Sequence, residues 1–364
     1  MTDQAINQTA PAAKAKREFF SPLTLKKLRR FRAIRRGYVS FLILAGLLLF
    51  SLFAELFINN RALLVKYEGK LYFPTYSDVY VGTEFGLDYQ YETNYRDLQA
   101  KFAAEGGDNF VIMPLVPWNA YEQDFIEGSF PPYPPSMERE HYLGTDAIGR
   151  DVLARLVYGF RVAMTFAITT VAVSMTIGVI FGCMMGYYGG WVDLVGQRLI
   201  EIMTVVPFLY IIMVVANILQ PSVWVLALIY ILFGWMASTW YMRSMTYKER
   251  ARDYVMAAKS IGVSNRRIII SHILPNTMVM IVTMVPFFMV AAIGALTSLD
   301  YLGFGVKPPT PSLGELLKQG KAHLDSPWIV SSAIAATTLI LVLVQFIGEA
   351  IREAFDPKRY TKYE

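Results

Sequence analysis

The sequence has few of the residues on which soluble enzymes depend. Only 17% of its 364 residues are charged, whereas 54% are hydrophobic; soluble domains carry about a quarter charged residues. Its single cysteine, Cys183, excludes an intrachain disulfide and argues against a Cys-based zinc site. The three histidines, His141, His272 and His323, lie too far apart for a local metal motif. The sequence contains no phosphate-binding glycine loop, nucleophile elbow or His-Glu-x-x-His motif, so we expect no catalytic residue, metal or cofactor on this chain.

Long uncharged stretches are abundant instead. Asp, Glu, Lys and Arg are missing from residues 37–54, 162–192, 202–242, 268–299 and 326–348. A helix needs about 20 apolar residues to cross a bilayer, so the run 202–242 is long enough for two crossings, and Pro221 falls where a turn would separate them. The sequence therefore predicts an all-α polytopic membrane protein with six transmembrane helices, near residues 38–58, 163–187, 199–219, 222–242, 275–298 and 328–348.

The distribution of basic residues predicts the orientation of these helices, because cytoplasmic segments of membrane proteins are rich in Lys and Arg. Residues 1–37 hold ten basic and two acidic residues, and residues 243–267 hold seven basic and two acidic residues. The segment 59–161 has nine basic and fifteen acidic residues. We therefore expect both termini in the cytoplasm and a large periplasmic insertion at 59–161. The net charge of +5 is explained by topology, and no nucleic-acid partner is needed.

These expectations divide the chain into consecutive parts. A cytoplasmic N-terminal region at 1–37 precedes the first helix at 38–58, which is too long and too far from the terminus for a cleaved signal and is predicted to be a retained anchor. The insertion at 59–161 is followed by a transmembrane core at 162–350 and a cytoplasmic tail at 351–364. Within the core, a cytoplasmic loop occupies 243–272 and a periplasmic loop occupies 299–327, where Ser312 begins a short helix that forms either a gate or a plug.

The N-terminal region contains an amphipathic pattern. Leu25, Leu28, Phe31 and Ile34 recur at helical spacing among arginines. This pattern is typical of a helix lying on the anionic cytoplasmic leaflet, with membrane lipids as its partner. A basic flank with no further role is an equally good interpretation.

The cytoplasmic loop 243–272 is predicted to form a helix, a turn and a second helix. Asp253 can cap the first helix, and Gly262 suits the left-handed position that ends it. Ala257 and Ala258 leave a face of the helix bare enough for another surface to approach closely. We therefore expect this segment to dock to a partner, although an ordinary helical hairpin would show the same residues.

The cytoplasmic loop and the residues directly after it resemble a motif of a known family. Met256-Ala257-Ala258, Gly262 and Leu274-Pro275 resemble the Glu-Ala-Ala-x-x-x-Gly loop of ABC importer permeases, with Met256 in place of the Glu and His272 in place of an Ile. The run His272-Ile-Leu-Pro-Asn276 is the form seen in the dipeptide and oligopeptide branch.

Other segments strengthen this resemblance. Residues 143–159 begin Leu-Gly-Thr-Asp-Ala-Ile-Gly-Arg-Asp-Val, residues 302–315 begin Leu-Gly-Phe-Gly, and residues 348–357 run from Gly-Glu-Ala-Ile to Asp-Pro. All three are similar to segments of peptide permeases. The length of the insertion and the run Pro114-Leu-Val-Pro-Trp118 look like the branch that imports peptides and the peptide antibiotic microcin C.

The resemblance implies the permease subunit of a Type I ABC importer in a bacterial inner membrane. Its implied partners are a second homologous permease subunit, two ATPase domains or subunits, a periplasmic solute-binding protein and a peptide substrate. ATP and Mg²⁺ would be bound by the ATPase subunits, so this chain would be a non-catalytic permease. The expected coupling helix consists of Asp253, Tyr254, Met256, Ala257, Ala258, Lys259 and Gly262.

Two further sets of candidate residues concern the substrate. The translocation pathway is expected to be lined by Asn217, Met284, Phe288, Thr297 and Ser298. The aromatic-rich insertion is expected to be folded and rich in loops, and contact with the binding protein is expected at Tyr89, Tyr91, Trp118 and Tyr121. Packing of these rings within the insertion is an equally weighted alternative for the second set.

Two rival functions are less well supported. An ion-coupled secondary transporter would be expected to carry carboxylates or broken helices in the middle of the membrane, and a membrane-embedded hydrolase would need a nucleophile and a base at that depth. The sequence places Glu55, Glu201 and Glu349 near helix ends. Neither rival is therefore favoured.

For Gly149, Arg150 and Asp151, we favour a turn that seats the second transmembrane helix over a substrate contact.

Overall fold

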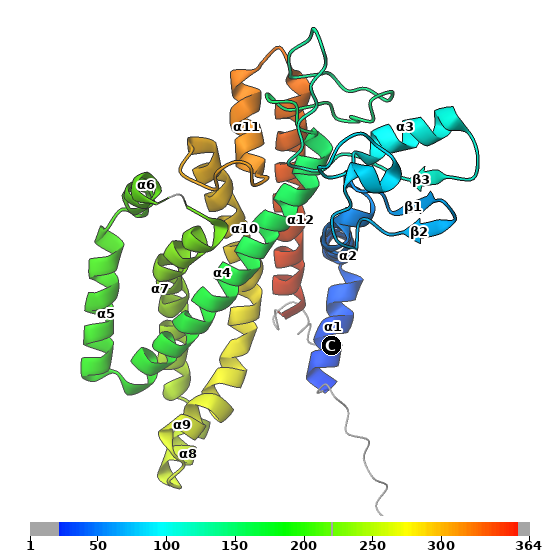
Figure 1. Cartoon of the computed structure of the whole chain (residues 1–364). Helices are drawn as coiled ribbons and strands as arrows, with labels where there is room; N and C mark the ends of the chain where they lie inside the picture. Colours follow the sequence, from blue (N-terminus) through cyan, green and yellow to red (C-terminus); the bar gives the residue numbers. More distant parts are fainter. Residues whose placement is uncertain (1–21, 220, 356–364) are drawn as a thin grey trace, which may run out of the picture.

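A computed structural model describes residues 22–219 and 221–355 of the chain (Figure 1). Long helices stand side by side in a bundle, and a lobe of mixed structure lies beside the end of the bundle that carries α11 (Figure 1). The first 21 residues of the expected N-terminal region 1–37 and residues 356–364 of the expected tail lie outside the described residues.

Within the described residues, five helical stretches are long and apolar enough to cross a membrane. They are α2 (Arg35–Leu52), α4 (Val152–Tyr188), α7 (Val223–Arg250), the stretch Asn265–Leu302 that ends in α10 (Leu274–Leu302), and α12 (Pro327–Phe355). A sixth crossing is possible if α5 (Gly190–Val205) and α6 (Phe208–Ile218) together form one span.

The expectation of one continuous helix at 199–219 is wrong. Helices α5 and α6 meet at an angle of 63°. The cause is Pro207, which cannot donate a backbone hydrogen bond and disfavours helical geometry at Val206, where the backbone is extended. This proline lies inside an uncharged run, so a search for charged residues does not detect the break.

The other helix boundaries also differ from the uncharged runs. Helix α2 ends at Leu52, before a 3₁₀ turn η1 (Ala54–Leu56), whereas α7 continues beyond the expected end at residue 242 to Arg250. The continuation includes Arg243, whose Nε donates to Asp193 Oδ1 of α5 at 2.5 Å. Charged residues can extend a helix where water or an ion-pair partner is reachable, so uncharged runs underestimate helix length.

Close packing of α4 on α7 forms the centre of the bundle. Gly178, Gly182 and Gly186 recur every four residues on the face of α4 that meets α7. A Cβ atom at Gly178 would lie 1.9 Å from the Ser238 hydroxyl oxygen, and one at Gly182 would lie 2.6 Å from the Met242 Cβ. Small residues at this spacing let two helix backbones approach closely, which is a common way for helices to associate in membranes.

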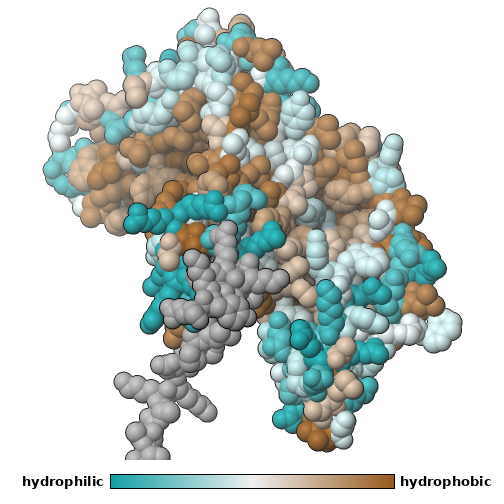
Figure 2. All heavy atoms as spheres, turned by 180° about the vertical axis from the view of Figure 1, so that it is seen from behind, coloured by the Kyte–Doolittle hydropathy of each residue, from teal (hydrophilic) through white to brown (hydrophobic). Residues whose placement is uncertain are grey.

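The main hydrophobic core joins α4 and α7 to α10, α12 and the short helix α11 (Leu313–Ala322). Figure 2 shows hydrophobic residues over the middle of the molecule, with hydrophilic residues gathered at its lower end. Apolar side chains such as Leu42, Leu228 and Ile334 are more than 40% exposed on the outside of the bundle. This arrangement is expected when lipid, instead of water, surrounds the helices.

The N-terminal helix α1 (Pro22–Ala33) confirms the helix expected from the amphipathic pattern. It leads into α2 and packs beside α12, where the Lys27 ammonium lies 4.6 Å from the centre of the Phe355 ring. Arg36, at the start of α2, lies 3.5 Å from the Glu349 carboxylate. These contacts hold the beginning and the end of the described chain together.

The insertion between α2 and α4 is folded, as expected, but it contains regular structure that the sequence analysis did not predict. Its elements are β1 (Leu64–Tyr67), β2 (Lys70–Tyr72), the 3₁₀ turn η2 (Gly82–Phe85), α3 (Tyr95–Glu105) and β3 (Phe110–Ile112). The strands form an antiparallel sheet in the order β2-β1-β3. Val65 and Phe85 are fully buried in the core of the insertion with Leu98 of α3.

Candidate functional site

The short helix α8 (Asp253–Ser260) lies at the end of the bundle opposite α11 (Figure 1). Gly262 follows it with φ of +76°, the left-handed conformation expected from the sequence. The Val263 amide donates to the Ala258 carbonyl at 3.1 Å, and the Gly262 amide donates to the Lys259 carbonyl at 3.1 Å. These two bonds form a Schellman motif, which ends α8 sharply and turns the chain toward α9 (Asn265–Ile268).

The inner face of α8 packs on the ends of two membrane helices. Val255 and Ala258 are buried against Tyr187, at the end of α4, and against Ile268 and Ile273, which lead into α10. The Tyr187 hydroxyl donates to the Asn265 side-chain oxygen at 2.8 Å. Helix α8 therefore packs directly on the end of α4 and on the segment that leads into α10.

Two details of the expected coupling helix need correction. Asp253 is the first residue of α8, where Arg252 occupies the N-cap position, so its carboxylate does not cap the helix. The two alanines do not form one bare face, because Ala258 points inward and is 7% exposed, whereas Ala257 is exposed. Adjacent residues on a helix are 100° apart and cannot share a narrow face.

The outer face of α8 is formed by Asp253, Met256, Ala257 and Lys259. It continues into Ile261, which is 81% exposed and which the sequence analysis did not single out. The exposure of Ile261 could have been predicted from the sequence, because Ile261 directly precedes Gly262 at the turn that ends the helix. Residues 253–262, called the tip below, thus expose two apolar side chains, Met256 and Ile261, among charged residues.

Tyr254 connects the tip to its neighbours on both sides. Its hydroxyl donates to Glu249 Oε2 at 2.7 Å and accepts from Asn276 Nδ2 at 3.0 Å. Burial and the hydrogen bond to Glu249 raise the pKa of Tyr254. Tyr254 therefore fixes α8 relative to α7 and α10.

The tip and α10 are joined without a break by a π-helical turn, η3 (Ile269–Ile273). Pro275, which follows it, has no amide hydrogen and would crowd the carbonyl four residues earlier in a regular α-helix. Widening the preceding turn accommodates this ring. The chain from Asn265 to Leu302 therefore acts as one long helical element.

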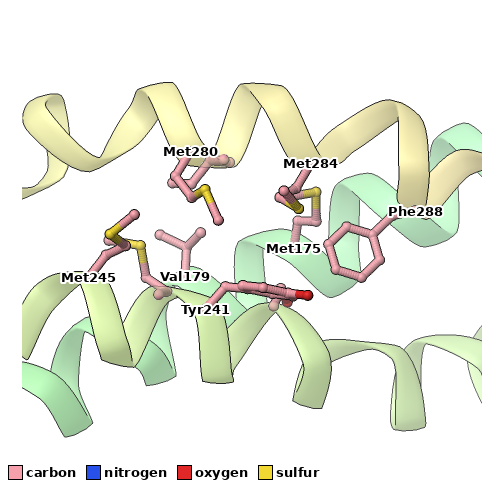
Figure 3. A pocket seen from close by; sticks show the side chains of 10 residues that line it. Met175, Val179, Tyr241, Met245, Met280, Met284 and Phe288 are labelled. Carbon is pink, nitrogen blue, oxygen red and sulfur yellow. The ribbon is translucent and has the colours of Figure 1, made fainter. Parts of the chain in front are cut away.

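Two of the five expected pathway residues line one cavity. Met284 and Phe288 of α10 face Tyr241 and Met245 of α7, with Met175 of α4 beside them (Figure 3). The Tyr241 and Phe288 rings meet edge to face, with centroids 6.5 Å apart.

The other three expected pathway residues lie elsewhere. Thr297 is buried where α10 meets α11. The two helices are close there: a Cβ added at Gly314 of α11 would lie 2.2 Å from the Thr297 carbonyl oxygen. Ser298 is exposed on α10. Asn217 is exposed near the end of α6, and its amide donates to the Met213 carbonyl at 2.8 Å. The structure therefore does not bring these three residues to the cavity that contains Met284 and Phe288.

At the opposite end of the bundle, a buried cluster of charges holds the start of α4 against α11. Arg150 Nε donates to Asp146 Oδ2 at 2.7 Å, and Arg150 Nη2 donates to Glu315 Oε1 at 2.9 Å. Arg155 also binds Glu315 and donates to the Ala120 carbonyl at 2.9 Å. Burial disfavours the charge of Arg150, but the two carboxylates outweigh this effect and raise its pKa.

The same segment begins α4. The Asp151 carboxylate caps α4 by accepting from the Ala154 amide at 2.7 Å, and it also contacts His141 Nδ1 at 2.8 Å. This geometry agrees with the interpretation of residues 149–151 as the seat of the second transmembrane helix. The pairing of Arg155 with Glu315 is not visible in the sequence, because residues so far apart in the chain give no local signal of an ion pair.

The four aromatic residues expected to contact a binding protein have different surroundings. Tyr91 is 67% exposed and stacks on Tyr89 with ring centroids 4.0 Å apart, and Tyr121 is 50% exposed. Trp118 is only 7% exposed, stacks on His141 and donates to the Arg139 carbonyl at 2.9 Å. Trp118 is thus an interior residue, and its expected contact with a binding protein is wrong because its ring is buried. Tyr67, Tyr72 and Tyr80 also pack on the core of the insertion, as the alternative interpretation expected.

The long apolar helices define a helical, multi-pass membrane protein. Comparison with known families makes this more specific: the model of the family described as "Binding-protein-dependent transport system inner membrane component" matches residues 178–360. The chain belongs to this family, and it is accordingly a multi-pass protein of the inner membrane.

Individual relatives match most of the chain. It is 42% identical to the inner membrane ABC transporter permease protein YejE of Escherichia coli, over 93% of this chain and 98% of that protein. It is 37% identical to the peptidoglycan transport system permease protein YejE of Agrobacterium fabrum, over 96% and 97% of the two chains. Identity to the oligopeptide transport system permease protein OppC of Mycobacterium bovis is 34%, over 68% of this chain and 84% of that protein. All three are named as permeases, in agreement with the expectation of a non-catalytic chain.

Proposed function

We propose that this chain is the permease subunit of an ATP-driven importer of peptides or peptide-like compounds, peptide antibiotics such as microcin C among them. The observation that carries the proposal is the tip at α8, an exposed helix with an apolar projection that is packed on the ends of α4 and α10. The substrate class is supported by the relatives, whose names refer to oligopeptide and peptidoglycan transport.

The proposed partners are a second homologous permease, two ATPase domains or subunits and a periplasmic binding protein. ATP and Mg²⁺ would be held by the ATPase subunits, and closure of their dimer would push or pull the outer face of α8. Because Val255 and Ala258 pack on Tyr187 and Ile273, this movement would tilt α4 and α10 together. Such a tilt would change the access of the cavity between these helices from one side of the membrane to the other.

The proposed orientation places α8 and both termini in the cytoplasm and the insertion in the periplasm. The excess of basic residues in 1–37 and 243–267 supports it. In this orientation α1 would lie on the anionic inner leaflet, and Tyr89, Tyr91 and Tyr121 would be available to the binding protein.

The test is reconstitution of the complete complex in proteoliposomes. We expect peptide-loaded binding protein to stimulate ATP hydrolysis and ATP to drive uptake of labelled peptide. The paired changes Met256→Asp and Ile261→Asp should abolish both activities and reduce recovery of the ATPase subunits with the permease. Replacement of Leu28, which is also exposed but lies on α1, by Asp is the matched control and should preserve ATPase recovery. Normal coupling in the tip variant would contradict the proposal.

The receptor role of the insertion has a separate test. Tyr91→Ala and Tyr121→Ala should weaken association of the binding protein while leaving the melting temperature of the permease unchanged. Tyr95→Ala is the contrasting variant, because Tyr95 is 2% exposed and belongs to the core of the insertion; it should lower the melting temperature. Unchanged association in both exposed variants would show that the insertion is scaffolding only.

A further inference from the structure

Methionine is concentrated in the cavity between α4, α7 and α10. It makes up 17 of the 364 residues of the chain but five of the ten that line this cavity, namely Met175, Met242, Met245, Met280 and Met284. None of the ten lining residues is charged. Figure 3 shows Met280, Met284 and Phe288 reaching from α10 toward Met245 and Tyr241 on α7.

The cavity between α4, α7 and α10 is a narrow constriction. Its volume is only about 20 Å³, enough for roughly one water molecule. Val179 lines both this cavity and a neighbouring one of about 450 Å³, which extends along α4 past Cys183 to Tyr188. The larger cavity is bounded by Leu274 and Arg266 at the end of the bundle that carries α8. The wider cavity thus lies nearer to α8, and the methionines line the narrower one.

The methionine side chains that line the constriction are flexible. A methionine side chain has three rotatable bonds and a polarisable sulfur, so it can adjust to neighbours of many shapes. The Ser238 hydroxyl joins α7 to α4, because it bonds to the Trp235 carbonyl of its own helix at 3.0 Å and to the Ser174 carbonyl of α4 at 3.3 Å. Pro286, between Met284 and Phe288 in the sequence, removes a backbone hydrogen bond from α10 at this level. Opening of the site would therefore come from rotamer changes and a small bend of α10, with the contact between α4 and α7 kept intact.

We infer that this methionine-lined constriction is a substrate-contact site that accepts uncharged peptide side chains of different shapes, aromatic and aliphatic, as they pass. The inference rests on the proposed function and specifies the substrate class of its pathway. Thioether groups contact aromatic edges and aliphatic chains about equally well, whereas a charged side chain finds no counter-charge among the lining residues. The five methionines thus provide chemical tolerance, and the narrowness of the site provides the barrier.

The first test is protection from chemical modification in the reconstituted complex. With Cys183→Ser as background, Met284→Cys should react with a small neutral thiol reagent, and turnover of the tripeptide Ala-Phe-Ala should slow this reaction. Met278→Cys is the matched control, because Met278 lies on the same helix and is 42% exposed but does not line the cavity. Equal effects of the peptide at both positions would overturn the inference.

The second test changes side-chain flexibility at nearly constant volume. Replacing Met245, Met280 and Met284 together by Ile, which is branched at Cβ and stiff, should reduce uptake of Ala-Phe-Ala relative to Ala-Ala-Ala about tenfold, because contacts with aromatic groups and room to adjust are lost. Replacing the same three residues by the more flexible Leu should preserve most of the ratio. Ala-Asp-Ala should remain the poorest substrate in every variant.

The outcomes separate this inference from the proposed function. If the wild-type complex imports none of the three peptides, the proposed function fails. If it imports them and the Ile variant keeps the wild-type ratio of Ala-Phe-Ala to Ala-Ala-Ala, the constriction does not select side chains and the inference alone is wrong.

Discussion

At the residue scale, single side chains and single backbone angles decide whether the tip and the seat of α4 keep their shape. Gly262 holds a φ of +76° with open space around its Cα, so a side chain there would meet backbone strain without a clash. Glu315 forms ion pairs with Arg150 and Arg155 in a buried cluster. Burial removes water from these charges, so each is stabilised by its ion-pair partners. Substitution at Gly262 therefore tests backbone strain, whereas substitution at Glu315 tests the compensation of buried charge.

Gly262→Val should impair the coupling of this chain to the ATPase subunits. The substitution disfavours the left-handed turn by about 1–2 kcal/mol and misdirects α8, so transport and substrate-stimulated ATP hydrolysis should both fall at normal membrane abundance. Gly69→Val is the control, because Gly69 has a φ of +77° and equally open surroundings in the β1–β2 turn. Normal transport in Gly262→Val would show that the turn has no role in coupling.

Glu315→Gln should destabilise the permease strongly. Removal of one carboxylate leaves a buried guanidinium without sufficient compensation, which costs about 3–5 kcal/mol. The matched control is Glu201→Gln, because the Arg198–Glu201 pair is well exposed and such pairs contribute about 1 kcal/mol or less. Thermal unfolding in detergent measures both variants, and equal shifts in melting temperature would be inconsistent with a structural role of the buried cluster.

At the element scale, the stability of the bundle depends on how closely α4 approaches α7. Gly182→Leu should separate the two helices, because even the first added carbon would lie 2.6 Å from Met242 Cβ; overpacking of this kind costs about 1–3 kcal/mol. Gly46→Leu on α2 introduces the same side chain where no atom lies within 4 Å of the added Cβ. We expect a lower melting temperature and aggregation in size-exclusion chromatography for Gly182→Leu only. Similar behaviour of the two variants would mean that the glycine contact does not limit packing.

At the scale of the whole molecule, the bundle has two ends of different character, with the insertion and α11 at one and α8 at the other (Figure 1). In cells with Cys183→Ser as background, Tyr91→Cys should react with a membrane-impermeant thiol reagent added from outside, whereas Ser260→Cys should react only after the membrane is permeabilised. Both positions are exposed, so accessibility within the chain does not limit the reaction. The reverse pattern would invert the proposed orientation.

Features that depend on local composition and short-range pattern are predictable from the sequence alone. Uncharged runs indicated the membrane helices because charge is costly in hydrocarbon, and Gly262 indicated its left-handed turn because residues with a Cβ rarely adopt it. Gly149, Arg150 and Asp151 indicate a turn that seats the second transmembrane helix, and Asp151 caps that helix, α4. The 63° bend between α5 and α6 was not predicted. Pro207, which causes the bend, is visible in the sequence but lies inside an uncharged run.

Contacts between residues far apart in the chain become visible in the folded structure. Arg155 and Glu315 are 160 positions apart and pair because α11 folds back onto the start of α4. Trp118 and Tyr91 look alike in an aromatic-rich segment, yet one is buried beneath Arg96 and the other is exposed, because burial depends on the packing of the whole insertion. The methionines of α4, α7 and α10 share one cavity because three helices converge there. Contacts between segments far apart in the chain follow from how the helices pack, and local sequence patterns carry no record of that packing.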